Sequence, residues 1–207
     1  MNIAELVLRN SFRHPRRSFL TSLGICVALL AFLLIKTILY TWESAVESRA
    51  KDRLIVRNAV SLMFPLPLAY LRQIAQVEGV VRSGYGNWIG AKYGDGKYMF
   101  QQFAIGGDFL NLYPEIQVTD DERKGFEGDR KGALLGDDVA KRFGIKTGDV
   151  IQLQGTIYPG LWEFKIYGIF KRVGKDDTRV LYFHYDYLNE RIRAEKMMDP
   201  DHVGFYG

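Results

Sequence analysis

Residues 18–35 form a run of eighteen residues without a charged side chain. A helix rises about 1.5 Å per residue, so this run covers roughly 27 Å, close to the hydrocarbon thickness of a bilayer. Tyr40 and Trp42 close the apolar stretch with the aromatic side chains that membrane interfaces favour. The pattern therefore predicts one transmembrane helix over residues 18–42, and the more polar remainder must lie on one side of the membrane.

Basic residues collect on the N-terminal side of this run, where Arg9, Arg13, Arg16 and Arg17 precede it beside a single acid. Because basic flanks are retained in the cytoplasm, we expect the N-terminus inside the cell and residues 43–207 outside, with the helix in the inner (cytoplasmic) membrane. A cleaved signal peptide is the competing interpretation. Its apolar region typically has about 7–15 residues and ends at a small-x-small site, and neither feature fits this sequence.

The span divides the chain into four segments. Residues 1–17 form a basic, amphipathic segment suited to lying in the inner interface or docking on a cytoplasmic partner, and Pro15 predicts a break before the span. Helical spacing continues past Trp42 without a Gly or Pro, which predicts a stalk over residues 43–51. Residues 52–207 then form the extracytoplasmic domain, which is long enough for one ordinary core or two small ones.

Two features of the span concern its neighbours in the membrane. Gly24 and Ala28 are four residues apart, so two small side chains share one helix face and let another helix approach closely. Lys36 interrupts the apolar stretch near its outer end. We expect its ammonium to reach the headgroups by snorkelling, with a polar contact inside a helix bundle as the alternative.

The exterior part alternates short apolar segments with turns rich in Gly, Pro and Asp, which predicts a mixed α+β domain. Strands are predicted over residues 54–56, 87–93, 97–105, 133–135, 150–153, 161–170, 180–183 and 203–206. Helical spacing predicts helices over residues 68–77, 109–113, 139–143 and 185–196. The Gly-Asp-Gly sequence at residues 94–96 predicts a hairpin that joins the second and third strands.

Charged positions in this domain have structural interpretations. Residues 120–129 are so rich in charge that we expect an exposed loop. Asp137 is expected to cap the helix that follows it, and Gly144 to end that helix in a left-handed conformation. Neighbouring acids such as Asp137 and Asp138 diverge by about 100° on a helix, so they do not form a catalytic dyad.

Composition narrows the range of functions. The chain has 207 residues, a formal net charge of +4 and one cysteine, Cys26, which lies inside the predicted span. The exterior part is therefore expected to lack disulfides, and three scattered histidines offer no ligand pair for zinc. No basic run follows the N-terminal flank, which argues against nucleic acid as a partner.

Sequence motifs for catalysis and cofactor binding do not occur. The sequence has no G-x-x-x-x-G-K-[ST] loop for ATP, no G-x-S-x-G and no H-E-x-x-H. Gly84, Gly86 and Gly90 miss the G-x-G-x-x-G spacing and are expected in a strand and a turn. We therefore assign no catalytic, cofactor-binding or metal-binding residue, and we expect no cofactor and no enzymatic activity in this chain.

Two stretches resemble the FtsX-like permeases of ABC transporters. The opening has LRN at residues 8–10 and HPRRS at residues 14–18, and it continues directly into the span. Residues 133–151, ALLGDDVAKRFGIKTGDVI, resemble the strand, glycine, helix and Gly-Asp turn of the MacB-like periplasmic core domain of that family. Residues 164–170 resemble the strand that follows this unit, and the similarity covers nearly the whole chain.

This resemblance implies the permease, or transmembrane, subunit of an ABC transporter. The subunit would pair with a second permease subunit, as a homodimer or heterodimer, and with a separate cytoplasmic ATPase. ATP hydrolysis in the ATPase would move the exterior domain during export or extraction of a substrate. Residues 1–17 would belong to the cytoplasmic coupling surface and residues 43–51 to a stalk, and extracytoplasmic proteins are further candidate partners.

Permeases of this family resume with more spanning helices after the exterior domain, so we expect an N-terminal fragment whose domain is truncated at its C-terminal end. The alternative is a single-span sensor or receptor with a binding ectodomain, although its inside portion would have only about seventeen residues. A membrane-anchored hydrolase is a third hypothesis. It needs a nucleophile and a base, and the sequence offers none at a recognisable spacing.

Overall fold

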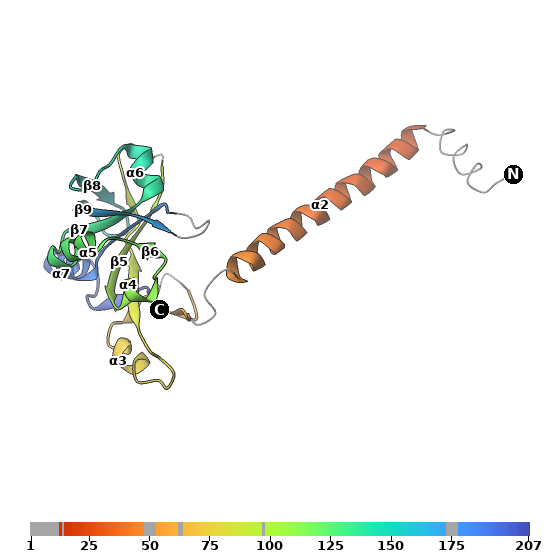
Figure 1. The fold of residues 1–207 in the computed structure, drawn as a ribbon. Helices are drawn as coiled ribbons and strands as arrows, with labels where there is room; N and C mark the ends of the chain where they lie inside the picture. Colours follow the sequence, from red (N-terminus) through yellow and green to blue (C-terminus); the bar gives the residue numbers. More distant parts are fainter. Residues whose placement is uncertain (1–12, 14, 48–52, 62–63, 97, 173–177) are drawn as a thin grey trace. The chain divides into compact units, whose positions relative to one another are not determined.

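The structure of the chain is a computed structural model. Contacts between residues divide it into two compact units, residues 1–53 and 54–207 (Figure 1). The residues that the structure describes are 13, 15–47, 53–61, 64–96, 98–172 and 178–207. Almost all of the amphipathic segment predicted over residues 1–17, Arg9 included, lies outside the described residues.

The first unit contains α2 (Pro15–Glu47), a continuous helix of 33 residues that includes the whole apolar run. Proline stands at its first position, where a missing N–H and a fixed φ suit a helix start. The hydroxyls of Thr21 and Thr37 donate to carbonyl oxygens four residues earlier, at 2.9 and 2.8 Å. These polar groups are therefore satisfied within the helix, as a lipid environment requires.

The second unit is built on one mixed sheet (Figure 1). Its strands follow the order β1 (Val56–Arg57), β12 (Phe205–Tyr206), β3 (Gly84–Trp88), β5 (Gln101–Gly107), β10 (Val180–His184), β7 (Gly132–Gly136), β9 (Gly160–Arg172), β8 (Val150–Gly155) and β4 (Ala91–Lys92). β10 runs parallel to β5, and β7 runs parallel to β9, whereas the other neighbours are antiparallel. β6 (Ile116–Gln117) also pairs with β9, and a separate small sheet joins β2 (Leu66–Pro67) to β11 (His202–Val203).

The central strand β10 separates two hydrophobic cores. Leu181 and Phe183 belong to one core, and Val180 and Tyr182 belong to the other, because successive side chains of a strand point to opposite faces. Helices supply the outer walls: α6 (Asp137–Phe143) and α7 (Tyr185–Glu195) contribute to the first core, and α4 (Phe109–Leu112) and α5 (Asp120–Gly128) to the second. The sheet is thus a middle layer with helices on both sides.

The segment from residue 132 to residue 195 agrees best with the sequence prediction. β7, α6, β8, β9, β10 and α7 all lie within two residues of their predicted bounds, and α4 confirms the short helix before Pro114. Gly144 has a φ of +67°, the left-handed conformation expected of a glycine that ends a helix, and its N–H donates to the Ala140 carbonyl.

The charged stretch 120–129 forms the helix α5, so its prediction as a loop was wrong. Thr119 and Glu122 cap its start reciprocally. The Thr119 hydroxyl accepts from the Glu122 N–H at 3.3 Å, and the Glu122 carboxylate accepts from the Thr119 N–H at 2.9 Å. Acids in the first turn interact favourably with the positive end of the helix dipole, and Phe126 packs into the core from the inner face.

Asp137 is the first residue of α6, so its prediction as the cap was wrong, and Gly136 holds the cap position. The Asp137 carboxylate instead pairs with Lys141 one turn later, at 2.6 Å. The hydroxyl of Thr178 takes over the capping, because it accepts from the Asp138 N–H at 3.1 Å and donates to the Asp138 carboxylate at 2.7 Å. A Cβ added to Gly136 would meet the Thr178 carbonyl oxygen at 1.7 Å, so this close approach requires glycine.

The predicted hairpin is correct only in part. Its two strands pair antiparallel as β3 and β5, but the chain turns away at Gly90, whose φ is +51°, and β4 pairs with β8 instead. The N–H of Thr156 donates to the Gly90 carbonyl at 2.9 Å, and this bond holds the turn at Gly90 beside the end of β8. β5 also begins at Gln101, later than the predicted start of that strand.

Three short elements differ from their predictions. The helix expected over residues 68–77 is reduced to α3 (Tyr70–Ile74), and the strand expected over residues 54–56 is β1, displaced by one to two residues. The strand expected over residues 203–206 is divided between two sheets at Gly204, whose N–H donates to the Gly86 carbonyl at 2.9 Å. Two-residue strands are too short to show an alternating pattern.

Removal of the Thr119 hydroxyl tests the cap of α5. Thr119→Ala leaves the Glu122 N–H without its side-chain acceptor, so we expect the free energy of unfolding to fall by about 1 kcal/mol. Urea unfolding of the detergent-solubilised chain, followed by tryptophan fluorescence, measures the change. Thr147→Ala, at an exposed turn position, is the matched control, and an equal effect of the two substitutions would contradict the capping role.

Candidate functional site

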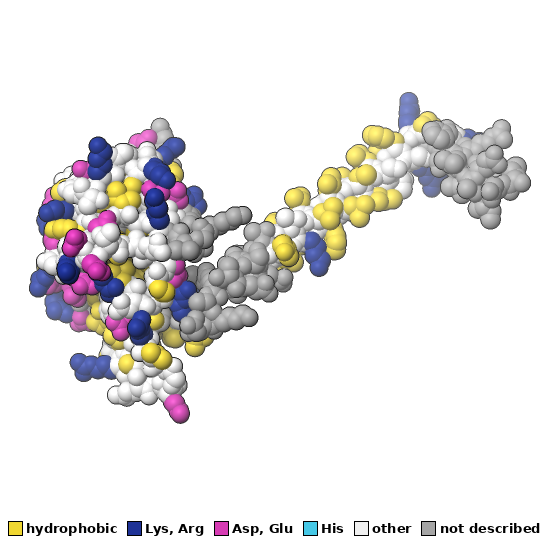
Figure 2. All heavy atoms as spheres, in the orientation of Figure 1, with side chains coloured by type: hydrophobic (Ala, Val, Ile, Leu, Met, Phe, Trp, Pro, Cys, Tyr) yellow, Lys and Arg dark blue, Asp and Glu magenta, His cyan; other side chains and the backbone are white. Residues whose placement is uncertain are grey.

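Apolar side chains cover the face of α2 that Figure 2 shows, and large apolar side chains at successive positions along the helix are exposed. Phe32, Leu33, Leu34 and Ile35 are 57–63% exposed, and four consecutive helical positions cover about 300° of the circumference. A helix that is hydrophobic on all sides belongs in a protein core or a membrane. The stretch Pro15–Tyr40 is long and apolar enough to cross a bilayer, and within the described residues no part of it is buried.

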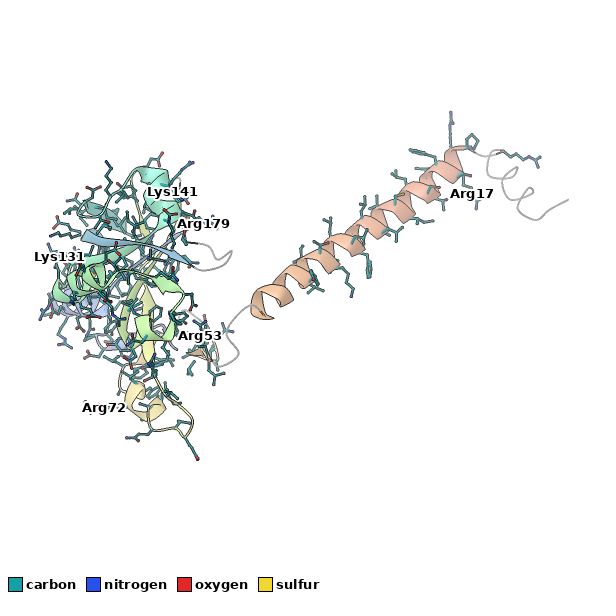
Figure 3. The ribbon with its side chains drawn as sticks, viewed as in Figure 1. Arg17, Arg53, Arg72, Lys131, Lys141 and Arg179 are labelled. Atoms are coloured by element: carbon teal, nitrogen blue, oxygen red, sulfur yellow. The ribbon has the colours of Figure 1, made fainter. Side chains whose placement is uncertain are left out.

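The N-terminal end of α2 carries the basic flank predicted from the sequence (Figure 3). Arg13, Arg16 and Arg17 are exposed there, and no acid occupies the first turn of α2. Cations at this end oppose the positive pole of the helix dipole, so the arginines do not stabilise the helix itself. Anionic phosphates of a membrane surface or an acidic partner surface would satisfy them.

Gly24 and Ala28 lie on one face of α2, one helical turn apart. A Cβ added to Gly24 would meet nothing within 4 Å. This face is open in the first unit, and a bulky side chain would fit there without disturbing α2 itself. Any effect of such a side chain would therefore come from a neighbouring helix.

The first and last strands of the second unit are joined by hydrogen bonds. β12 lies between β1 and β3, with Val56 opposite Tyr206 and Arg57 opposite Phe205. Beyond β12, the N–H of Gly207 donates to the Gly84 carbonyl at 2.9 Å. Because β1 and β12 are antiparallel, the chain enters and leaves this edge of the sheet on the same side.

Tyr206 anchors this joint in the core. Its side chain is fully buried, and its hydroxyl donates to the Pro67 carbonyl at 2.5 Å. Burial raises the pKa of the Tyr206 phenol to about 12, so the hydroxyl keeps its proton and its donor role at neutral pH. The neighbouring Phe205 ring occupies the space where a Cβ of Gly86 would stand, at 2.6 Å, so β3 requires glycine there.

A polar cleft of 210 Å³ opens at the carboxyl ends of the parallel strands β5 and β10. Arg123 bridges its wall, with Nε 2.9 Å from the Glu127 carboxylate and a terminal nitrogen 2.8 Å from the Asn111 side-chain oxygen. The His184 ring stacks on Phe126 with centroids 4.0 Å apart, and its Nε2 lies 2.6 Å from the Phe126 carbonyl oxygen. These contacts tie α5 to the end of the sheet.

Aromatic and charged side chains pack together in the wall of this cleft. Tyr85 lies in its wall against Tyr185, with ring centroids 5.1 Å apart, and burial, followed by the nearby Asp186 carboxylate, raises the pKa of the Tyr85 phenol. Its charged and titratable lining comes from Asp108, Arg123, Glu127, His184 and Asp186, and among the described residues that line it there is no serine, threonine, cysteine or lysine. Sequence reasoning missed both this cleft and the β1–β12 joint, because each depends on pairing between distant strands.

The residues assigned from the sequence gather at the first unit. Arg16, Arg17, Gly24 and Ala28 lie on α2, Arg13 stands just before it, and Arg9 is outside the described residues. In the described part of the chain, no group of three or more His, Cys, Asp or Glu side chains is placed to hold a metal ion. The aromatic residues of β10 and the start of α7 belong to the cores, since Tyr182, Phe183 and Tyr185 are buried.

The described residues combine one helix long and apolar enough to cross a bilayer with a sheet-rich mixed domain. The model of the family described as the MacB-like periplasmic core domain matches residues 18–203, and the chain belongs to this family. A comparison of the sequence with curated proteins found no match.

Three solved structures are similar to the chain at low identity. The periplasmic region of MacB from Actinobacillus actinomycetemcomitans has 10% identity and a TM-score of 0.45, with 73% of this chain and 64% of that one covered. The extracellular domain of the noncanonic ABC-type transporter YknZ from Gram-positive bacteria has 11% identity and a TM-score of 0.46, with 69% and 71% covered. A domain of a putative permease protein from Porphyromonas gingivalis has 14% identity and a TM-score of 0.44, with 68% and 60% covered. The chain thus spans less than two thirds of the first and third of these structures.

A bulky side chain at Gly24 tests the predicted packing face. Gly24→Ile should weaken association with a partner helix by roughly 1 kcal/mol, because the backbones can no longer approach closely. Energy transfer between differently labelled chains in lipid bilayers measures self-association. Cys26→Ile, about 200° around the helix from Gly24, is the matched control. Equal loss in both variants, or no loss in Gly24→Ile, would contradict a packing role for this face.

Proposed function

We propose that the chain is the permease subunit of an ABC transporter, or its N-terminal part. The observation that carries this proposal is the match to the MacB-like periplasmic core domain over residues 18–203, in a chain that begins with a bilayer-length apolar helix. A cytoplasmic partner ATPase would supply the energy, because this sequence contains no phosphate-binding loop of its own. The family match does not favour the single-span receptor.

The proposal places α2 across the inner membrane with its N-terminus in the cytoplasm. Arg13, Arg16 and Arg17 support this orientation, since basic residues are retained on the cytoplasmic side. The same arginines, with Arg9 and the rest of residues 1–17, would contact the ATPase. Residues 54–207 would then be exposed outside the cytoplasm as the part that moves.

The β1–β12 joint supports the proposed transmission of motion. A displacement of α2 reaches the domain through the chain at β1, and β1 is hydrogen-bonded to β12 and through it to β3. The buried Tyr206 links β12 to Pro67, so a pull on β1 acts on the sheet and on the core together. The domain is thereby suited to moving as one body during export or extraction of a substrate.

The β1–β12 joint also supports the proposal that the domain is inserted between two membrane helices. β12 runs back alongside β1, so a chain that continues after β12 leaves the domain on the side where the chain from α2 enters. A second permease subunit, identical or different, would complete the membrane part. Gly24 and Ala28 are the positions proposed for helix contacts in that assembly.

Isolation of the native protein from membranes tests this function. We expect a polypeptide well above 23.7 kDa, bound to a subunit that contains a phosphate-binding loop and hydrolyses ATP. In nanodiscs, where both membrane sides are accessible, Arg17→Glu should weaken binding of the ATPase roughly tenfold, equivalent to about 1.4 kcal/mol. Arg72→Glu, an exposed arginine of α3, is the control (Figure 3).

Two results would contradict the proposal. One is a native mass near 23.7 kDa with no ATPase bound, which fits a single-span protein. The other is an equal effect of Arg17→Glu and Arg72→Glu, which would assign the weakening to charge alone rather than to the flank of α2.

A further inference from the structure

The segment that opens the second unit exposes large apolar side chains to an unusual degree. Among the nine described residues between 54 and 64, five such side chains are 44–82% exposed: Leu54, Ile55, Val56, Val60 and Phe64. By contrast, the strands that follow place most of their large apolar side chains in the two cores. Such a concentration of exposed apolar side chains in one short segment is typical of a surface that contacts something else.

The charge of this segment is one-sided. Between Asp52 and Glu78 the sequence has Arg53, Arg57 and Arg72 and no acid. Arg57 is exposed on β1, among the apolar side chains. Apolar residues interspersed with arginines match the chemistry of a membrane interface, where aliphatic side chains enter the acyl boundary and cations meet anionic headgroups.

The length of chain before this segment keeps it near the bilayer. Tyr40 ends the membrane-spanning stretch, and α2 continues for seven residues to Glu47, which adds roughly 10 Å. Seven further residue steps lead to Leu54, and these can span at most about 25 Å. A tether this short holds the segment at an effective concentration near millimolar beside the membrane, so even a weak affinity is sufficient for contact.

The backbone of β1 limits the depth of that contact. β1 is the end strand of the sheet and pairs with β12 along one edge. Unpaired N–H and C=O groups are not tolerated in hydrocarbon, whereas the hydrated headgroup layer can satisfy them. A second copy of the chain is the less suitable occupant, because a stable protein interface uses about 20–30 residues a side, more than this segment offers.

We propose that residues 54–61, together with Phe64, form a second membrane contact, in the outer headgroup layer of the bilayer that α2 spans. This inference rests on the proposed function, because it requires α2 to cross the membrane. The exposed Arg57 binds anionic headgroups, and the exposed aliphatic and aromatic side chains enter the acyl boundary. The contact gives the moving domain a resting position against the membrane.

Lipid-borne quenchers test this proposal on the full chain in nanodiscs that contain phosphatidylglycerol. A Val60→Cys variant in a Cys26→Ser background carries one environment-sensitive fluorophore, and shallow nitroxide lipids quench it on contact. The matched control is Val81→Cys in the same background. Val60 and Val81 are both valines of the second unit and are 82% and 90% exposed, so they differ in location rather than in exposure. Leu54→Cys repeats the measurement at a second exposed position.

We expect the Val60 and Leu54 labels to be quenched at least threefold more than the Val81 label. Replacement of phosphatidylglycerol by phosphatidylcholine, or the added substitution Arg57→Glu, should reduce the Val60 quenching at least twofold. Equal quenching at Val60 and Val81 would overturn the proposal. So would cross-linking of Val60→Cys between two chains without quenching, which would assign the segment to a second copy.

The native cysteine separates failure of this inference from failure of the proposed function. A label on Cys26 in the otherwise unchanged chain should be quenched by nitroxides deep in the acyl chains, because Cys26 lies in the middle of the apolar helix. Quenching at Cys26 without quenching at Val60 overturns the second contact alone. No quenching at Cys26 overturns the membrane-spanning role of α2, and the second contact with it.

Discussion

The exposure of the apolar side chains of α2 is the constraint on which the rest of the structure depends. Full burial of one such side chain stabilises by about 1.5–3 kcal/mol. More than a dozen large apolar side chains of α2 are exposed, so their transfer from water to an apolar environment is favourable by tens of kcal/mol. An apolar surrounding therefore stabilises α2 strongly, whether a bilayer or the apolar surface of another protein provides it. The family match and the length of the apolar stretch agree with a bilayer.

The domain is organised to resist deformation at the point where the chain enters it. β10 has apolar side chains on both faces, so it couples the two cores, and α4, α5, α6 and α7 close these cores from outside. β12 ties the entry strand β1 to this layered body, and Tyr206 fixes β12 in the core. The polar cleft at the ends of β5 and β10 adds a further tie through Arg123 and His184. The start of the second unit is thus connected to the whole sheet through the pairing of β1, β12 and β3.

Sequence reasoning succeeded where the structural signal is local and strong. The long helix α2 follows from one uninterrupted apolar run, and the unit from β7 to β9 follows from alternation together with the helix-ending glycine at residue 144. It failed at α5. The high charge of this stretch indicated a loop, but the Thr119–Glu122 cap and the buried Phe126 stabilise a helix there. It failed at Asp137, because the capping hydroxyl comes from Thr178, forty residues away in the sequence. It also missed the β1–β12 joint, since two-residue strands have no periodicity and their pairing is fixed by tertiary contacts.

The central claim is that α2 crosses the membrane with residues 54–207 outside the cytoplasm, and controlled proteolysis tests it most directly. Protease is added to intact spheroplasts and, separately, to sealed inverted membrane vesicles, each containing the chain with a tag after residue 207. The account predicts that the tag and the domain are lost in spheroplasts and protected in inverted vesicles until detergent is added. Loss in inverted vesicles with protection in spheroplasts would contradict the orientation, and loss in both would contradict a membrane-spanning helix.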